Sequence, residues 1–279
     1  MMDRLGIEFI SVFGLPPVQF VNLAADLGCR HIGMMLRPMA DNPHGYPAWS
    51  LSQDAALRRE TVAAMRDRGV SISLGEGFFS RAGADLRDSA ADLELMRELG
   101  AERIGTLSVD PDSARAFDQF GVLAEMTAAL GMELVIEFGP PMAVADLPTA
   151  VAAARHVGRP NTRLLIDTMH LVRSGSGAAD LAALDPGMIG YVQLCDVPLV
   201  SKYADYAEEA KYERMTPGTG ELPLLDILNV LPPHLAIGLE VPQRALARSG
   251  VKPHERLGGC VAAARSLLAR AGQNRRTSR

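Results

Sequence analysis

Four predicted strands of this sequence end on side chains whose oxygen atoms can bind a metal ion. Glu137 in LVIEFGP, Asp167 in RLLIDTMH and Glu240 in AIGLEVP each follow an apolar run that is typical of a buried strand. Gln193 in YVQLCD ends a similar run, which only its own side chain interrupts. An ionised carboxylate at the end of a buried strand is costly unless it is paired or bound to a cation. Three carboxylates and an amide oxygen therefore predict a hard, oxygen-rich site for one divalent ion.

The elements that position these residues alternate along the chain between short apolar runs and amphipathic stretches. The apolar runs are rich in Ile, Val and Leu, as strands buried on both faces should be, and they cover residues 7–13, 31–35, 70–75, 103–109, 133–138, 163–167, 189–195 and 235–241. The amphipathic stretches predict helices over residues 17–27, 57–68, 85–99, 113–130, 147–157, 224–231 and 253–271. Glycine directly follows several of these helices, as it often does past a helix C-terminus, at Gly28, Gly69, Gly100 and Gly131.

This alternation predicts an α/β fold, a (β/α)8 TIM barrel in a single domain. Eight βα units in 279 residues average about 35 residues each, which fits a barrel of ~250 residues with insertions. The main alternative is a doubly wound open sheet, but such a sheet rarely needs eight strands, and no G-x-G-x-x-G follows the first predicted strand. We expect the barrel to span residues 1–272, with a basic C-terminal tail over residues 273–279.

In such a barrel the ends of strands 5 to 8 are neighbours, so the four oxygen ligands would converge at one side of the mouth. Two long segments, residues 36–51 and 196–221, leave the same face and are candidates for covers of the site. Glu76 follows strand 3 at this face, and the flanking Gly75 and Gly77 allow close backbone approach. We expect Glu76 either to contact the substrate or to form a structural salt bridge.

The four strand ends resemble those of the xylose isomerase-like barrel superfamily of sugar isomerases and epimerases, in the phrases IEFGP, LLIDTMHL, YVQLCD and GLEVP. The resemblance extends from the first strand to the last helix and implies one Mn, Mg, Co or Zn ion held at the ends of strands 5 to 8. In LLIDTMHL it implies that Asp167 binds the metal and that His170 binds the substrate. YERMTPGTGELPL resembles the family's Arg…Pro-Gly-x-Gly segment, which implies that Arg214 contacts the substrate.

Gln193 departs from the pattern of many epimerases in this group, which have histidine at the corresponding position. Glutamine there resembles the hydroxypyruvate isomerase branch and the 3-dehydroshikimate dehydratase branch. Because an amide oxygen is neutral and harder than imidazole, it should favour Mg or Mn over Zn.

The expected reaction begins with removal of a proton from the carbon beside a carbonyl group and proceeds through a metal-stabilised enediolate. Glu137 and Glu240 would lie on opposite sides of that carbon, so that one removes the proton and the other returns it. This chemistry predicts an isomerase or epimerase of a small keto-sugar or hydroxy-keto acid. The alternative is a metal-dependent dehydratase, a lyase such as a 3-dehydroshikimate dehydratase, in which a β-hydroxyl leaves after the same first step. The four retained ligands argue against a non-catalytic binding module.

Composition narrows the class of partner. A net charge of −5 and a pI near 5.7 argue against nucleic acid, and six histidines are few for the multi-zinc AP endonuclease branch of the superfamily. No apolar run approaches the ~18 residues of a membrane helix, and the N-terminus lacks the pattern of a secretory signal. The three scattered cysteines, Cys29, Cys195 and Cys260, are typical of reduced thiols. We expect a cytoplasmic protein with a small-molecule substrate, with homo-oligomers left open.

Overall fold

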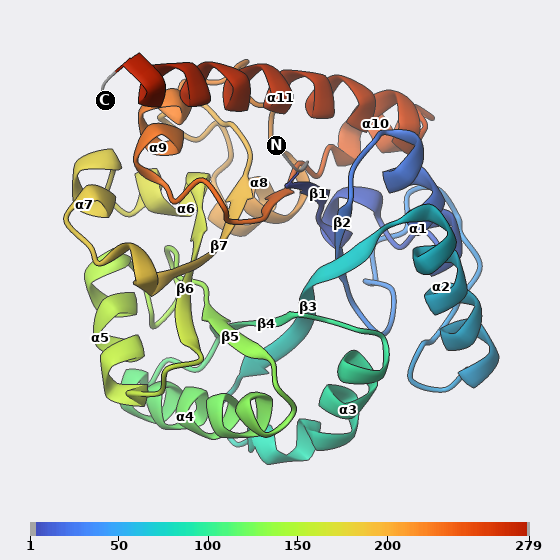
Figure 1. Cartoon of the computed structure of the whole chain (residues 1–279), viewed down its shortest axis with the longest axis horizontal. Helices are drawn as coiled ribbons and strands as arrows, with labels where there is room; N and C mark the ends of the chain where they lie inside the picture. The colour runs from blue at the N-terminus through green and yellow to red at the C-terminus, as the bar shows by residue number, and fades with distance from the viewer. Residues whose placement is uncertain (1–3, 278–279) are drawn as a thin grey trace.

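The structure, a computed structural model, describes residues 4–277. Eight parallel strands form a closed barrel in the order of the chain, and β1 pairs with β8 to complete it (Figure 1). The predicted single-domain (β/α)8 TIM barrel is therefore confirmed. The strands are β1 (Leu5–Ile7), β2 (His31–Met34), β3 (Ser71–Ser80), β4 (Arg103–Ser108), β5 (Glu133–Ile136), β6 (Thr162–Asp167), β7 (Ile189–Leu194) and β8 (Ile237–Leu239).

Helices surround the barrel on its outer side (Figure 1). The α-helices are α1 (Pro17–Asp26), α2 (Ala55–Arg68), α3 (Ala90–Glu98), α4 (Ser113–Ala129), α5 (Leu147–Val157), α6 (Thr168–Arg173), α7 (Ala178–Ala182), α8 (Tyr206–Tyr212), α9 (Leu224–Val230), α10 (Arg244–Arg248) and α11 (Pro253–Thr277). Three 3-10 helices accompany them, η1 (Phe9–Val12), η2 (Leu86–Ser89) and η3 (Pro186–Met188). Within residues 4–277, no helix is both long enough and apolar enough to cross a membrane.

Local sequence signals determine where the longer helices begin and end. Asp54, Asp112 and Asp146 accept backbone N–H hydrogen bonds at the N-termini of α2, α4 and α5. The four glycines that were predicted to follow helices adopt φ angles between 64° and 83°, in the left-handed region. Glycine enters that region without the steric cost of a side chain, so the four predicted helix ends are confirmed.

The first predicted strand, residues 7–13, is wrong beyond its first residue. β1 is only three residues long, and η1 follows it. In η1, Ser11 is bound to the end of β8 and to the segment after it: its Oγ donates to Leu239 O (3.0 Å) and accepts the N–H of Val241 (2.8 Å). This turn leaves Glu8 at the C-terminal end of β1 with its side chain fully buried.

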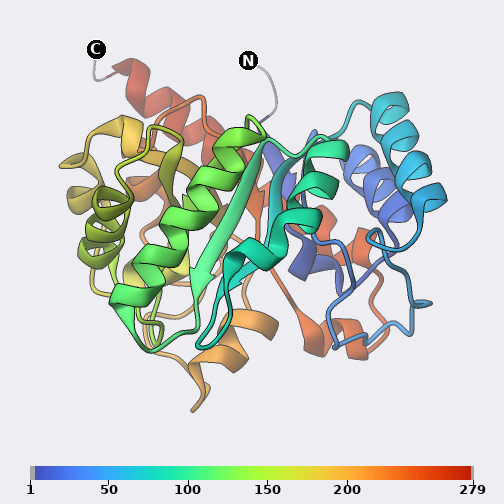
Figure 2. The same ribbon diagram turned by 90° about the horizontal axis from the view of Figure 1, so that it is seen from below.

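Four short helices, α6, α7, α8 and α10, were not predicted. Each has five to seven residues, which is too short for a helical period of apolar residues to be recognised. All four lie in the segments that follow the last three strands: α6 and α7 follow β6, α8 follows β7, and α10 follows β8. In the side view of Figure 2, the orange segment that contains α8 lies at one end of the barrel.

The last helix, α11, is longer than predicted. It runs along the outside of the barrel and packs against α9 (Figure 1). The predicted tail, residues 273–279, overlaps the last turns of this helix, because α11 continues to Thr277. Residues 278–279 of that predicted tail lie outside the described residues.

The interior of the barrel combines apolar and polar side chains. An apolar cluster inside the barrel consists of Leu74, Val135, Leu165, Tyr191 and Ala236. The Tyr191 hydroxyl donates to Glu8 Oε1 (2.7 Å) and lies 3.0 Å from Ser73 Oγ. Because a buried polar group costs folding free energy unless it is paired, these contacts are needed to keep Glu8 inside the barrel.

Candidate functional site

The ligand quartet, by which we mean Glu137, Asp167, Gln193 and Glu240, lies at the C-terminal ends of β5 to β8. Asp167 and Gln193 are register partners on β6 and β7, and Gln193 is also the register partner of Gly238 on β8. Glu137 directly follows β5, and Glu240 directly follows β8. The closed barrel therefore brings all four predicted ligands to one side of its mouth.

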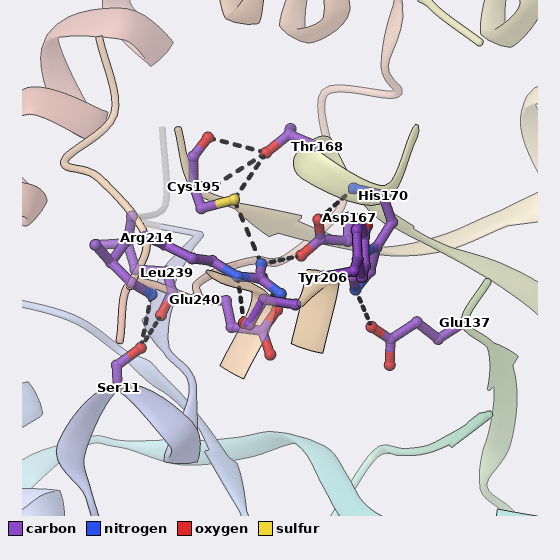
Figure 3. Close-up of polar contacts among 12 residues, drawn as sticks. Ser11, Glu137, Asp167, Thr168, His170, Cys195, Tyr206, Arg214, Leu239 and Glu240 are labelled. Atoms are coloured by element: carbon purple, nitrogen blue, oxygen red, sulfur yellow. Dashed lines mark hydrogen bonds and ion pairs between the residues drawn. The ribbon is translucent and has the colours of Figure 1, made fainter. Parts of the chain in front are cut away.

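Arg214 lies between two of these carboxylates (Figure 3). Its Nη1 forms ion pairs with Asp167 Oδ2 and, at 2.9 Å, with Glu240 Oε2. The same nitrogen lies 3.4 Å from Cys195 Sγ, and Nε donates to Ala210 O in α8 (2.7 Å). Since only 2% of the arginine side chain is exposed, its positive charge acts almost entirely on these neighbours.

Burial and charge act on the carboxylates in opposite directions. Burial alone would raise the pKa of Asp167, but the charges of Arg214 and His170 outweigh it and hold that pKa below its usual range. Burial raises the pKa of Glu240 well above its ordinary value, although Arg214 opposes this shift. Asp167 is therefore the firmly ionised partner of Arg214, whereas Glu240 binds a proton more readily, as a group that exchanges protons with a substrate should.

His170 is positioned by α6, which begins directly after Asp167. Its backbone N–H donates to Asp167 Oδ1 (2.9 Å), and its ring Nδ1 lies 2.5 Å from the Tyr206 hydroxyl (Figure 3). Its Nε2 lies 3.4 Å from Glu137 Oε1. Ligand atoms of Glu137, Asp167 and His170 all lie within 4.8 Å of one another. His170, which the sequence assigned to substrate, is thus also close enough to complete a second set of metal ligands.

The quartet supplies the types of donor atom that a divalent ion prefers. Gln193 Oε1 is buried and accepts no hydrogen bond within residues 4–277, which is a costly state for an amide oxygen. When ionised, Glu137, Asp167 and Glu240 carry three negative charges against the one positive charge of Arg214. A divalent cation would balance the remaining two charges and give Gln193 a partner.

Glu76 lies in the same cavity, but its partner is another acid. Its carboxyl group lies beside that of Glu8, and each of the two acids affects the charge state of the other. Gly33 makes room for both, because a Cβ at that position would stand 2.0 Å from Glu8 Oε2 and 2.4 Å from Glu76 Oε1. Burial raises the pKa of Glu76 to about 7 and the pKa of Glu8 well above its ordinary value. The pair therefore retains a proton near neutral pH.

Glu8 was missed in the sequence because its apolar run was predicted to continue as a strand through residue 13. The triplet Ile-Glu-Phe occurs at residues 7–9 and again at residues 136–138. In both copies the glutamate directly follows the end of a strand. This repeat is the signal that could have identified Glu8.

Asp196 organises the segment that follows Arg214. Its carboxylate accepts the backbone N–H groups of Gly218 (2.8 Å), Gly220 (3.0 Å) and Leu222 (3.1 Å). Gly220 has no room for a side chain, because a Cβ there would stand 2.3 Å from Asp196 Oδ1. The Pro-Gly-x-Gly pattern therefore wraps around a buried carboxylate and gives Arg214 a fixed point of attachment.

These side chains border a cavity of about 660 Å³ at the mouth of the barrel, and volumes of this order are typical of small-molecule sites. Glu137, His170, Gln193, Arg214 and Glu240 line it, and Glu76 lines it from β3. Asp167 does not reach the cavity surface, since it lies behind the guanidinium of Arg214. The site can thus hold a small molecule against three of the four predicted ligands.

A family model described as a xylose isomerase-like TIM barrel matches residues 21–256. Comparison with curated proteins gives no match. Among solved structures, that of the IolI protein with a bound zinc atom superposes with a TM-score of 0.78 at 14% identity, covering 96% of this chain and 98% of that chain.

Two further solved structures are similar. D-psicose 3-epimerase in the presence of D-fructose has a TM-score of 0.69 at 16% identity, covering 95% of this chain and 99% of that chain. The probable 3-DHS dehydratase AsbF from Bacillus anthracis has a TM-score of 0.69 at 15% identity, covering 90% of this chain and 97% of that chain. At such identities the likeness shows the fold alone.

Proposed function

Because the chain belongs to the xylose isomerase-like TIM barrel family, we propose that it is a divalent-metal-dependent isomerase or epimerase of a small keto-sugar or hydroxy-keto acid. The observation that carries this proposal is the position of the ligand quartet at the ends of four consecutive strands, where Gln193 Oε1 is buried and has no hydrogen-bond partner among the described residues. The metal is Mn or Mg, which hard oxygen donors favour over Co or Zn. The zinc atom of the IolI structure and the D-fructose of the epimerase structure support a metal and a hydroxy-ketone substrate.

The two glutamates divide the proton transfers. A divalent ion held by the quartet would polarise the substrate carbonyl and stabilise the charge left by proton removal. Glu240, whose pKa burial raises, takes the proton from the carbon beside the carbonyl. Glu137 approaches from β5 instead of β8 and returns a proton to the neighbouring carbon or to the opposite face. His170 Nε2 lies 3.4 Å from Glu137 Oε1.

His170 and Arg214 orient the substrate. The His170 ring is held by the Tyr206 hydroxyl and stacks on the Tyr206 ring, with centroids 5.7 Å apart. Arg214 lines the cavity, and its planar guanidinium suits a carboxylate or two adjacent oxygen atoms. A substrate with a carbonyl and a neighbouring hydroxyl or carboxylate therefore meets matching groups here.

A metal-dependent dehydratase is the second candidate, and Glu76 favours it. Elimination of water needs an acid for the departing hydroxyl in addition to a base for the carbon-bound proton. Glu76 lines the cavity, and burial raises its pKa to about 7, so it can hold a proton near neutral pH. The fold of the probable 3-DHS dehydratase AsbF also supports this alternative.

Deuterium incorporation tests the proposal. The Mn-loaded protein is incubated in D2O with keto-sugars, hydroxy-keto acids and 3-dehydroshikimate. The masses of the products are then measured by mass spectrometry. An isomerase or epimerase incorporates deuterium on carbon and loses no water, whereas a dehydratase yields a product that has lost one molecule of water. Glu240→Gln should slow exchange by roughly 10²–10⁴-fold while keeping an oxygen ligand. Glu94→Gln, an exposed residue of α3, is the matched control. Wild-type exchange in Glu240→Gln would contradict the assigned role.

A further inference from the structure

The cavity extends well beyond the ligand quartet. Glu137, Gln193 and Glu240 border it from the ends of β5, β7 and β8, and a second region lies against the ends of β2 to β5. The volume of about 660 Å³ lies in the middle of the range for sites that bury drug-sized ligands, ~300–1,000 Å³. The chelating part of a substrate, a carbonyl with one neighbouring oxygen, fills only a small part of this space.

Large apolar side chains dominate the second region, which we call the apolar half. They are Met35, Met39, Phe79, Leu107, Val109 and Met142. Val109 is 58% exposed. Arg81 and Lys211 also line the cavity but are exposed, and the Arg81 guanidinium lies over the Phe79 ring, 5.4 Å from its centroid.

Polar side chains on β4 and the segment after it are already bound within the protein. Thr106 Oγ1 donates to Phe78 O (2.8 Å). Ser108 Oγ donates to Asp110 O (3.3 Å) and accepts the Asp110 N–H (3.1 Å). The Asp110 carboxylate is paired with Arg115 at 2.5 Å. These groups offer little hydrogen-bonding capacity to a ligand.

The two acids of this region are partly engaged as well. Asp41 faces Arg244 and Arg248, each at 3.6 Å, and Glu76 lies beside Glu8. Asp41 Oδ2 and Glu76 Oε1 accept no hydrogen bond within residues 4–277. These two carboxylates could pair with one or two hydroxyl groups, but the remaining hydroxyls of a polyhydroxylated chain would lie against apolar side chains without partners, which is costly. A hydrocarbon group would lose no hydrogen bonds and would cover exposed apolar surface.

We propose that the substrate carries an apolar body, an aryl ring or a branched alkyl group about the size of a phenylalanine side chain, attached to its hydroxy-ketone or hydroxy-keto acid head. This inference rests on the proposed function, because the ligand quartet binds the head while the apolar half holds the body. It narrows the substrate class from sugars to hydroxy-carbonyl compounds with a hydrocarbon substituent. Burying such a group should strengthen binding by roughly 10- to 100-fold.

Isothermal titration of the Mn-loaded protein tests the inference with ligands that share one head. Hydroxyacetone carries only a methyl group, 2-hydroxyacetophenone carries a phenyl ring, and D-fructose carries a polyhydroxylated chain. We expect 2-hydroxyacetophenone to bind roughly 10- to 100-fold more tightly than hydroxyacetone, with D-fructose no tighter than hydroxyacetone. Equal affinities, or tighter binding of D-fructose, would overturn the inference.

Variants locate the preference in the apolar half. Phe79→Ser and Leu107→Ser should each remove most of the advantage of 2-hydroxyacetophenone while leaving the affinity for hydroxyacetone and Mn unchanged. Val230→Ser is the matched control, because Val230 is a 37% exposed apolar residue of α9 that does not line the cavity. An advantage that survives both substitutions would place the ring elsewhere and overturn the inference. If either variant fails to fold, the comparison of ligands on the wild type decides.

Mn binding without ligand is measured first, so that the two proposals can fail separately. Absence of Mn binding would overturn the proposed function and this inference together. Normal Mn binding and deuterium exchange, combined with no preference for the phenyl ligand, would overturn the inference and leave the proposed function standing.

Discussion

At the scale of single residues, the amide of Gln193 is the group that most clearly lacks a partner. Its Oε1 is buried and accepts no hydrogen bond among the described residues. We predict that Gln193→Leu lowers the affinity for Mn by about tenfold or more, while the metal-free protein loses no stability because an unpaired oxygen has been removed. Titration calorimetry and thermal melts measure the two effects. Gln193→His is the matched variant and should retain binding but shift preference from Mn towards Zn.

Arg214 is the second residue on which the site depends, since it holds Asp167 and Glu240 together. We predict that Arg214→Met destabilises the metal-free protein by about 3–5 kcal/mol, because two buried carboxylates lose their cation. Mn should restore most of this loss by supplying positive charge. Urea unfolding in EDTA measures the destabilisation of the metal-free protein, and urea unfolding with Mn measures how much of it the metal restores. Arg214→Lys keeps the charge but loses the contact with Ala210 O, so its free energy of unfolding should lie between those of the wild type and Arg214→Met. Equal destabilisation with and without Mn would argue against a metal at this position.

At the scale of elements, β1, β2 and β3 enclose the pair formed by Glu8 and Glu76. Burial raises the pKa of Glu76 from 4.5 to about 7. Between these pH values the folded protein holds a proton that the unfolded chain has released, so stability falls as pH rises, by up to ~1.4 kcal/mol per pH unit. We predict that Glu76→Gln makes the free energy of unfolding flatter over this interval than in the wild type. Urea unfolding at several pH values measures the slope, and a slope equal to that of the wild type would contradict the shared proton.

The elements that could be predicted from the sequence are those determined by local physics. The ends of α2 are determined locally: Asp54 accepts a backbone hydrogen bond at its N-terminus, and Gly69 adopts a left-handed backbone angle at its C-terminus. The strand ends at Asp167 and Glu240 were recognisable because an ionised carboxylate directly after a buried apolar run is costly unless it is paired or bound to a cation. The closed order of the strands then followed from the repeat of βα units.

What the sequence did not predict depends on contacts between distant elements. Glu8 lies beside Glu76 because β2, the strand between β1 and β3, has no side chain at Gly33 to separate them. The position of Arg214 between two carboxylates depends on how the long segment after β7 folds back. Arg214 donates a hydrogen bond to α8, and this helix is too short for a helical repeat of apolar residues to be recognised in the sequence.

At the scale of the whole molecule, one arginine joins the segments that follow three strands. Arg244 of α10, after β8, forms an ion pair with Glu208 of α8, after β7. It also faces Asp41, after β2, at 3.6 Å, and its guanidinium lies 4.0 Å from the centroid of the Tyr212 ring. The Arg244 side chain is only 14% exposed, so these contacts form one connection across the mouth of the barrel.

This connection should matter for the site because α8 carries Tyr206, whose hydroxyl holds the ring of His170. We predict that Arg244→Ala increases hydrogen exchange in α8 and raises KM more than it lowers kcat, since the substrate-orienting ring loses its support. The melting temperature should change little, because the barrel core is untouched and partly exposed ion pairs contribute about 0–1 kcal/mol. Arg248→Ala is the matched control: that side chain is 59% exposed and shares only the contact with Asp41 at 3.6 Å. If exchange in α8 is the same in both variants, the helix is held by its own packing, and His170 does not depend on the segments after β2 and β8.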